Sequence, residues 1–285
     1  MPIPIPEALA EAGDLAAAKA KQVKQLPRYL LSSALAGAYV GVAVVLLVSV
    51  AGPLAAVESP FTKLVSGVVF GVALVLVVFA GAELFTGNAM YLLQGLFAGR
   101  VRGRDLAAVW AASLFGNLVG SVAFAALVHG GGTLSGGPGG SFIATITASK
   151  NAAAGPQLFW RSVLCNLLVC LALWMAGRTR SDAAKLLVLW WALLAFIASG
   201  FEHSVANMTI FSLGIFDGSA TWADLGRNLL WTVPGNIVGG GVLVGAAYAW
   251  IGRVPPVPVP PAPDPAVLDP AAATPDQPDL VGAQS

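Results

Sequence analysis

A short polar motif occurs twice in this apolar chain, at positions 119 residues apart (202 − 83). The first copy runs from Glu83 to Asn88 and the second from Glu202 to Asn207, and each places an acid and an amide in an apolar stretch. The same offset relates Asn117 to Asn236. A polar interruption repeated in register in both halves of a membrane protein points to a transport site near the bilayer midplane. The sequence therefore predicts a chain built from two related halves around such a site.

Composition places the chain in the membrane. Its 285 residues are 57% hydrophobic and 10% charged, whereas soluble domains carry about 25% charged residues. The net charge of +1 provides no basic field for nucleic acid. Cys165 and Cys170 lie inside an apolar run, so we expect two small buried side chains rather than a disulfide or a metal pair. No metal or cofactor is expected.

The lengths of the apolar runs predict six membrane spans. A spanning helix needs about 20 residues. The runs occupy residues 29–57, 64–82, 84–99, 106–128, 157–177, 186–201, 204–216 and 228–252. Residues 64–99 and 186–216 each exceed one span and contain a polar motif, so each is predicted to be one span broken at that motif. The expected fold class is an all-α integral membrane bundle of six helices, with helices 2 and 5 broken.

The distribution of basic residues predicts the orientation. Eleven of the 15 Lys and Arg residues fall in segments on the side of the two termini, against four on the other side. Positive residues concentrate in cytoplasmic segments, so both termini are expected in the cytoplasm. Three spans per half is an odd number, so the second half must have the inverted topology.

Three regions are predicted along the chain. Residues 1–28 form a cytoplasmic N-terminal amphipathic helix at the membrane surface, with the helix itself from Glu7 to Leu26. Residues 29–253 form the transmembrane channel domain, in which the Gly-rich stretch from His129 to Gly140 is expected to be irregular. Residues 254–285 form a disordered, Pro-rich cytoplasmic tail.

His203 is the first candidate functional residue. A histidine inside a membrane segment usually faces a cavity and often marks a proton or ion path. A structural histidine that donates to a backbone carbonyl is the alternative. The position of His203 at a helix break, beside Glu202, favours the functional interpretation.

Other polar residues are candidates for structural roles. Glu83 and Glu202 are expected to accept hydrogen bonds from the backbone N–H groups freed at the breaks, with a proton relay as the alternative. Four asparagines could hold loop against helix, because an amide donates and accepts together: Asn88, Asn117, Asn207 and Asn236. Asn166 lies within the fourth span and is a candidate to face a pore.

Lys150 and four apolar residues are candidates for controlling passage. A cation near an entrance raises the local concentration of an anion, although a lone outer lysine is often just solvated. Side chains that could form constrictions against hydrated ions, or could simply pack, are Phe70, Leu74, Phe85 and Phe196.

At these residues the chain resembles the formate/nitrite transporter family. The matching stretches are Ala82 to Asn88, Gly116 to Gly120, Leu164 to Cys170, Phe201 to Met208 and Gly235 to Gly239, and the resemblance covers roughly residues 10–252. It implies an aquaporin-like bundle of two inverted three-helix repeats, assembled as a homopentamer in the bacterial inner membrane. It also implies small monovalent anions, formate or nitrite, as substrates.

The resemblance also implies roles for individual residues. His203 resembles the family's central histidine, Thr86 its partner on the loop that interrupts the second span, and Lys150 the outer lysine. Asn166 resembles a pore-lining asparagine. The cytoplasmic constriction corresponds to Leu74 and Phe85, and the periplasmic one to Phe70 and Phe196. The run from Ala195 to Gly200 and the Leu-Phe-Thr-Gly form of the first motif resemble the nitrite branch.

The sequence thus predicts a channel for nitrite with proton-linked permeation through His203, in contact with membrane lipid. A formate channel is the alternative. A neutral-solute channel is a weaker one, because its paired Asn-Pro-Ala breaks do not occur here. A membrane enzyme is not expected, because the only other histidine is His129 and no Cys/His spacing suits zinc or haem.

Overall fold

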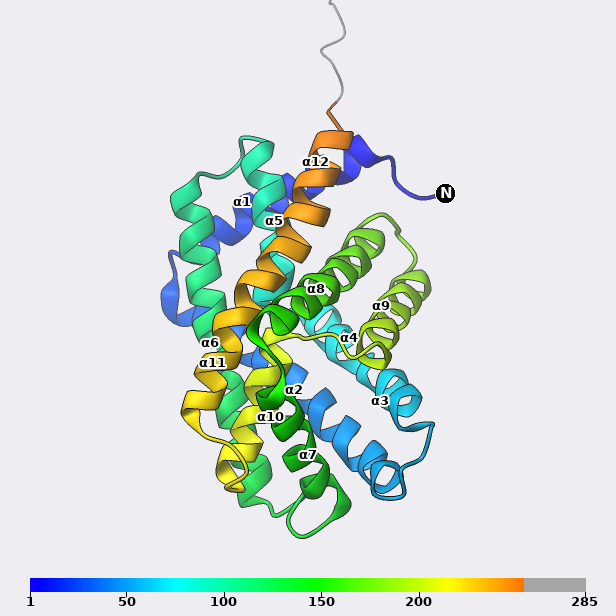
Figure 1. Cartoon of the computed structure of the whole chain (residues 1–285). Coiled ribbons are helices and arrows are strands. Elements are labelled where there is room, and N and C mark those ends of the chain that lie inside the picture. The colour runs from blue at the N-terminus through cyan, green and yellow to red at the C-terminus, as the bar shows by residue number, and fades with distance from the viewer. Residues whose placement is uncertain (254–285) are drawn as a thin grey trace, which may run out of the picture. The chain divides into compact units, whose positions relative to one another are not determined.

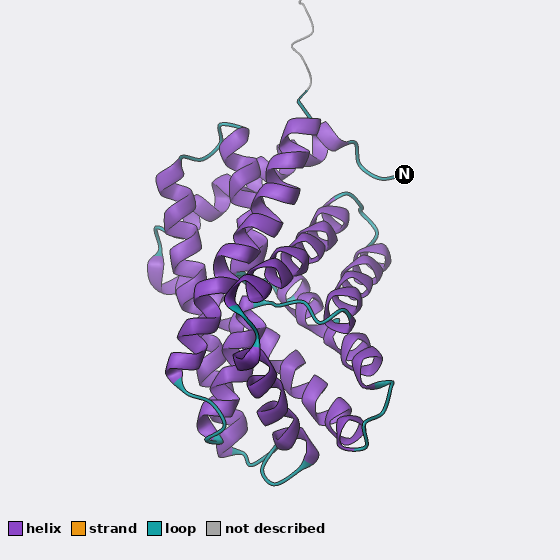
Figure 2. Cartoon of the chain, in the orientation of Figure 1, coloured by secondary structure: helices purple, strands orange, loops and turns teal. Residues whose placement is uncertain are grey.

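The computed structural model describes residues 1–253, which consist of helices joined by loops (Figures 1 and 2). The predicted tail, 254–285, lies outside the described residues. The helices are α1 Ile5–Gln22, α2 Leu26–Ala56, α3 Thr62–Phe70, α4 Val72–Phe79, α5 Phe85–Phe97, α6 Gly103–Gly130, α7 Pro138–Ala152, α8 Gly155–Gly177, α9 Asp182–Ala198, α10 Ser204–Phe216, α11 Trp222–Asn236, the π-helical segment η1 Ile237–Ala246, and α12 Ala247–Ile251.

These helices build the six predicted spans. Within the described residues, five helical stretches are long and apolar enough to cross a membrane: Leu26–Ala56, Thr62–Phe79, Gly103–Gly130, Gly155–Gly177 and Trp222–Ile251. The remaining span is divided between α9 and α10, of 17 and 13 residues, and neither is long enough alone. The second span is likewise divided between α3–α4 and α5.

Both predicted breaks are confirmed. The helix stops between Phe79 and Phe85 in the first half and between Ala198 and Ser204 in the second. Gly81 and Gly200, again 119 residues apart (200 − 81), adopt positive φ angles of 77° and 73° in the two breaks. Glycine reaches this left-handed region without steric cost, so these glycines allow the chain to leave the helix. From the middle of the bundle α5 runs toward the end that carries the N-terminus, and α10 runs toward the opposite end (Figure 1).

Small residues allow close packing within each half. A Cβ added at Gly120 of α6 would overlap the backbone carbonyl of Ala34 in α2, and one at Gly239 of η1 would overlap that of Val163 in α8. The two glycines are also 119 residues apart (239 − 120). Small residues let membrane helices approach closely, so the first and last helices of each half pack by the same contact.

The structure contains two features that the sequence did not predict. The stretch from His129 to Gly140 is irregular at residues 131–137, as expected, but α7, Pro138–Ala152, is an additional helix before the fourth span that was not predicted. The sixth span was expected as one regular helix, but residues 237–246 are π-helical where consecutive glycines pack against α5 and α8. The small side chains leave the local helical geometry weakly determined, and packing decides it.

The N-terminal helix packs against the bundle. It runs from Ile5 to Gln22 and buries an alanine-rich face that includes Ala12, Ala16 and Ala20. Ala16 packs against Gly95 of α5, where a Cβ would clash with it. Short side chains bring the backbone of α1 close to the spans and place Lys19 against the first break.

Candidate functional site

Two asparagines support the two helix breaks in the same way. In the first break, the Phe85 N–H donates to Oδ1 of Asn117 at 2.9 Å, and Nδ2 of Asn117 donates to the Glu83 carbonyl at 2.9 Å. Nδ2 also donates to the Ser33 carbonyl at 2.7 Å. Asn117 is fully buried. Its amide therefore satisfies backbone groups that the interrupted helix leaves without partners.

Asn236 repeats this arrangement in the second break. Its Oδ1 accepts from the Ser204 N–H at 2.9 Å, and its Nδ2 donates to the carbonyls of Glu202 at 3.1 Å and Ser162 at 2.8 Å. Ser204 and Glu202 are the counterparts of Phe85 and Glu83 at the 119-residue offset. The two halves thus share one hydrogen-bonding scheme.

Glu83 and Glu202 were expected from the sequence to accept hydrogen bonds from freed backbone N–H groups, but their carboxylates bind side chains instead. Glu83 accepts Nζ of Lys19 at 2.7 Å on both carboxylate oxygens, together with the hydroxyl of Tyr29 and Nδ2 of Asn88, each at 3.1 Å. The bonds recorded for its carboxylate thus come from side chains rather than from freed backbone N–H groups. Asn117 has that task instead, because its amide reaches both the N–H and the carbonyl of the break.

Glu202 is paired in the same manner. Lys150 of α7 donates to Oε2 of Glu202 at 2.6 Å, and Asn207 donates to the same oxygen at 2.7 Å. The side chains of Lys150 and Glu202 are only 12% and 5% exposed. Lys150, considered as a free outer cation from sequence, is therefore committed to an ion pair. Each half has such a pair, supplied by a helix that precedes its three spans.

His203 ends the second break and begins α10. Its Nδ1 accepts the N–H of Ala206 at 3.1 Å, which caps the helix. Because Nδ1 accepts, a neutral ring carries its proton on Nε2. Nε2 lies 3.2 Å from Oγ1 of Thr86 and can donate to it. Phe196 stacks on the ring at a centroid distance of 5.9 Å, so the tautomer and the orientation of the imidazole are both determined.

Thr86 lies in the first turn of α5, not on the interrupting loop as expected. The two members of the pair therefore come from the two broken spans, since His203 precedes α10. Thr86 is fully buried, and His203 is 5% exposed. The pair joins the two halves at the level where both helices start.

Three cavities follow one another along this region. The α7-side cavity, of about 470 Å³, reaches Lys150, Glu202 and His203. The central cavity, of about 10 Å³, lies between apolar side chains and His203. The α1-side cavity, of about 380 Å³, reaches Lys19 and Glu83. Two wide cavities, each with charged residues on its wall, thus approach one narrow, apolar segment from opposite ends of the bundle.

The residues shared between cavities identify the narrow points. Phe70, Phe196 and His203 line both the α7-side and the central cavity. Leu74 and Leu84 line both the central and the α1-side cavity. The predicted residues Phe70, Leu74 and Phe196 are therefore brought together around the narrow segment.

Phe85 is not. It is buried and is absent from the residues lining these three cavities, whereas Leu84, which the sequence analysis missed, lines two of them. The repeat held the signal, because Leu84 is the counterpart of His203 at the 119-residue offset (203 − 84).

Asn166 does not line these cavities either. It is fully buried, and its Nδ2 donates to the carbonyl of Asn236 at 2.6 Å and to that of Thr86 at 3.1 Å. It therefore joins the first broken span to the sixth span instead of facing a pore. Among residues 1–253 no cluster of His, Cys, Asp or Glu could hold a metal ion.

The fold and site define a membrane transport protein. Six spans in two inverted halves, with the second and fifth spans broken at mid-height, form the aquaporin-like architecture. The two wide cavities with charged residues and the apolar segment between them provide a path rather than a reaction centre.

The chain belongs to the formate/nitrite transporter family, whose sequence profile matches residues 6–250. It is 44% identical over 225 residues to the nitrite transporter NirC of Escherichia coli strain K12, covering 77% of this chain and 82% of that protein. It is 40% identical over 252 residues to a probable formate transporter of Methanothermobacter thermautotrophicus, covering 82% and 92%.

Two solved structures of channels of this family are similar to this chain. An FNT family ion channel has a TM-score of 0.80 and 41% identity, covering 87% of this chain and 99% of that one. A pentameric formate channel with formate bound has a TM-score of 0.68 and 30% identity, covering 80% and 98%. The family resemblance seen in the sequence is confirmed, and the family consists of transporters and channels rather than enzymes.

Proposed function

We propose that this protein is a channel for small monovalent anions, with nitrite as its main substrate. The observation that carries the proposal is His203, hydrogen-bonded to Thr86 and lining an apolar narrowing between two wide cavities that carry charged residues. The nitrite assignment draws on the 44% identity to a nitrite transporter. Formate is the second candidate, because relatives described as formate transporters or channels are 40% and 36% identical.

The narrow segment is the basis of the mechanism that we propose. An anion that leaves water for an apolar passage loses several kcal/mol of solvation even after relaxation. Transfer of a proton to the anion removes this cost, because a neutral acid crosses instead. We assign His203 as the polar station where this happens, since it is the hydrogen-bonding side chain that lines the central cavity, and Thr86 is its buried hydrogen-bond partner.

The hydrogen bonds of His203 favour a relay over a permanently charged ring. Protonation at Nδ1 removes the acceptor that the Ala206 N–H uses, and the helix cap is lost. In the neutral ring Nε2–H donates to Thr86 or to an arriving anion. The Nε2 proton passes to the anion, and water of the α7-side cavity, which His203 lines, returns a proton to Nε2, so the ring ends neutral and the cavity water has lost one proton.

The assembly and orientation are also proposed. The pentameric formate channel is a structural neighbour, so we assign a homopentamer with one path in each protomer. Large apolar side chains exposed on this chain are available to lipid and neighbouring protomers; they include Phe115, Leu127, Trp160, Trp191 and Trp250. The similarity to a bacterial transporter favours the bacterial inner membrane, and the excess of Lys and Arg on the side of the termini favours an orientation with both termini in the cytoplasm.

Flux measurements test the proposal. Nitrite, formate and chloride uptake are compared in proteoliposomes at two pH values, with wild type and H203N. We expect nitrite to exceed chloride, to be faster at the lower pH, and to lose its pH dependence in H203N. An unchanged pH dependence in H203N removes His203 from proton handling. Faster passage of glycerol or water than of nitrite, measured by liposome swelling, refutes the anion assignment.

A further inference from the structure

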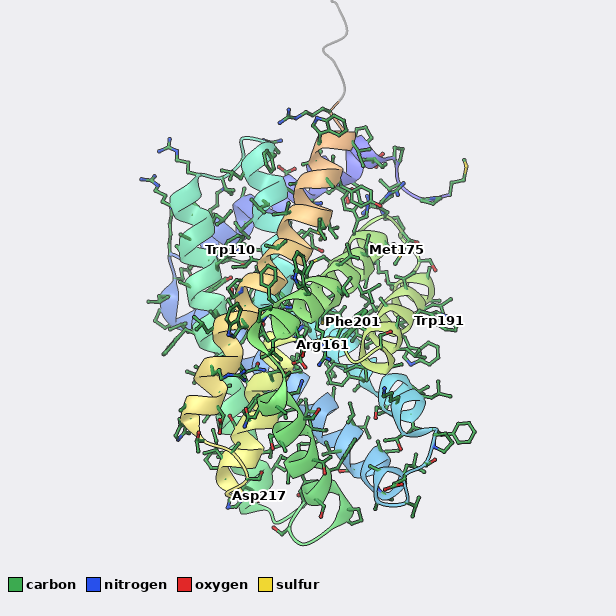
Figure 3. All side chains as sticks on the ribbon, in the orientation of Figure 1. Trp110, Arg161, Met175, Trp191, Phe201 and Asp217 are labelled. Carbon is green, nitrogen blue, oxygen red and sulfur yellow. The ribbon has the colours of Figure 1, made fainter. Side chains whose placement is uncertain are left out.

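Arg161 lies at an unusual depth for an unpaired charge. It belongs to α8, and its backbone carbonyl accepts the N–H of Glu202 at 3.2 Å. Arg161 is therefore level with the second helix break, and Figure 3 shows it beside Phe201 at mid-height in the bundle. Charged side chains at this depth in a membrane protein are costly and usually face water-filled cavities or ion paths. Arg161 follows this rule, because it lines the α7-side cavity.

The charges around this cavity do not cancel. Lys63, Lys150 and Arg161 contribute three cations, and Glu202 contributes one carboxylate. Lys150 is bound to Glu202 at 2.6 Å, so that pair carries no net charge. Lys63 on α3 and Arg161 on α8 form no ion pair with any residue in the range 1–253. Two positive charges therefore remain on different walls of the cavity.

The rest of the wall strengthens their effect. Apolar side chains, among them Phe142, Ile146 and Phe201, line the same cavity. Low-dielectric walls focus the field of nearby charges and raise the local concentration of counter-ions. The cavity ends at His203, so an anion concentrated there stands next to the polar station.

We propose that Arg161, assisted by Lys63, recruits the anion from the α7 side and selects for planar anions with two oxygen atoms. A guanidinium presents a rigid fork of N–H donors that fits such an anion with two parallel hydrogen bonds, and it is more weakly hydrated than an ammonium group. Lys150 instead maintains the ion pair with Glu202. This inference rests on the proposed function, because it describes how the substrate reaches His203.

The test measures initial rates of nitrite uptake against nitrite concentration in proteoliposomes. Wild type is compared with R161Q, R161K and K63Q, and with K185Q as the matched control. Lys185 is a partly exposed cation of α9, paired with Asp182 and outside the α7-side cavity, so K185Q removes the same charge elsewhere. Each protein is assayed at low ionic strength and with an added impermeant salt.

At low ionic strength, R161Q should raise the half-saturating nitrite concentration about tenfold, the lower end of the range for electrostatic focusing. The maximal rate should stay within about twofold, and K63Q should give a smaller rise. Added salt of about 1 M shortens the screening length to about 3 Å and should remove most of the difference. R161K should keep the sensitivity to salt but lose part of the preference for nitrite over chloride, and K185Q should behave like wild type.

Several results overturn the inference. The inference is wrong if wild type conducts nitrite and both R161Q and K63Q have the same half-saturating nitrite concentration as wild type. A lower maximal rate with unchanged half-saturation, insensitive to salt, makes Arg161 a structural residue and also overturns it. If R161Q does not insert, K63Q and R161K decide by the same criteria. Wild type no faster than empty liposomes refutes the proposed function itself, which separates the two failures.

Discussion

Replacing Asn117 by Leu should destabilise the first helix break severely. The amide of Asn117 satisfies the N–H of Phe85 and the carbonyl of Glu83, and both belong to the interrupted backbone. Leu has a similar volume but no polar group, so both backbone groups lose this partner. A buried polar group without a partner costs about 1–3 kcal/mol, and two give a loss of about 2–6 kcal/mol. The third bond, to the Ser33 carbonyl, is left out of this sum because that carbonyl lies inside α2.

The symmetry of the fold extends this prediction. Asn236 makes the equivalent bonds to Ser204 and Glu202, so N236L should lose a similar amount. Q157L is the matched control, because Gln157 is exposed and its amide oxygen caps only the N–H of Ala154 at 3.4 Å. Its cost should be within about 1 kcal/mol.

Tryptophan fluorescence during unfolding by SDS in mixed micelles measures these differences at a fixed SDS fraction. The chain has eight tryptophans to report on it. If N117L and N236L both unfold within about 0.5 kcal/mol of Q157L, the breaks do not depend on these amides and the reasoning is refuted.

Three further predictions concern the Lys150–Glu202 ion pair, the narrow segment and the contact between α2 and α6. E202Q leaves the Lys150 ammonium buried without its charged partner, so it should lower the free energy of unfolding by about 3–5 kcal/mol. In a double-mutant cycle measured by SDS unfolding, E202Q/K150M should cost less than the sum of the two single changes, and strict additivity speaks against the ion pair. L84A should increase chloride leakage in proteoliposomes, because Leu84 lines both the central and the α1-side cavity. F85A should instead lower the free energy of unfolding by about 3–5 kcal/mol with little added leakage, and the opposite pattern would place Phe85 at the constriction. G120V places a side chain against the Ala34 carbonyl and should lower the free energy of unfolding by more than about 3 kcal/mol. Size-exclusion chromatography should therefore show little folded protein, and a normal yield contradicts the close contact of α2 and α6.

The spans and the breaks could be read from local sequence. Apolar length determines where a helix can cross a bilayer, because every backbone group must be satisfied inside the segment. Two runs too long for one span, each with a polar motif at the same offset, located both interruptions to within a few residues. His203 and the two supporting asparagines were found because they belong to or accompany that repeat, whereas Thr86 was found only through the resemblance to the family.

The partners of the charged residues could not be read in this way. Glu83 pairs with Lys19, which is 64 residues away, and Glu202 with Lys150, which is 52 residues away. Nothing in the local pattern separates a solvated lysine from one held in an ion pair. The difference arises only when α1 and α7 pack against the broken spans and bring the ammonium groups to the carboxylates.

The choice between Leu84 and Phe85 was also made by the tertiary structure. The two residues are adjacent and both apolar, but Leu84 has an extended backbone (φ −98°, ψ 124°) immediately before α5, whereas Phe85 is the first residue of the helix. The start of α5 at Phe85 therefore leaves Leu84 at the cavities and turns Phe85 into the packed interior. The sequence by itself determined which segments enter the membrane and where they are interrupted, since both depend on local hydrophobicity. Packing between distant helices decided which side chains face the path, because direction in space depends on helix phase and on neighbours that the local sequence does not specify.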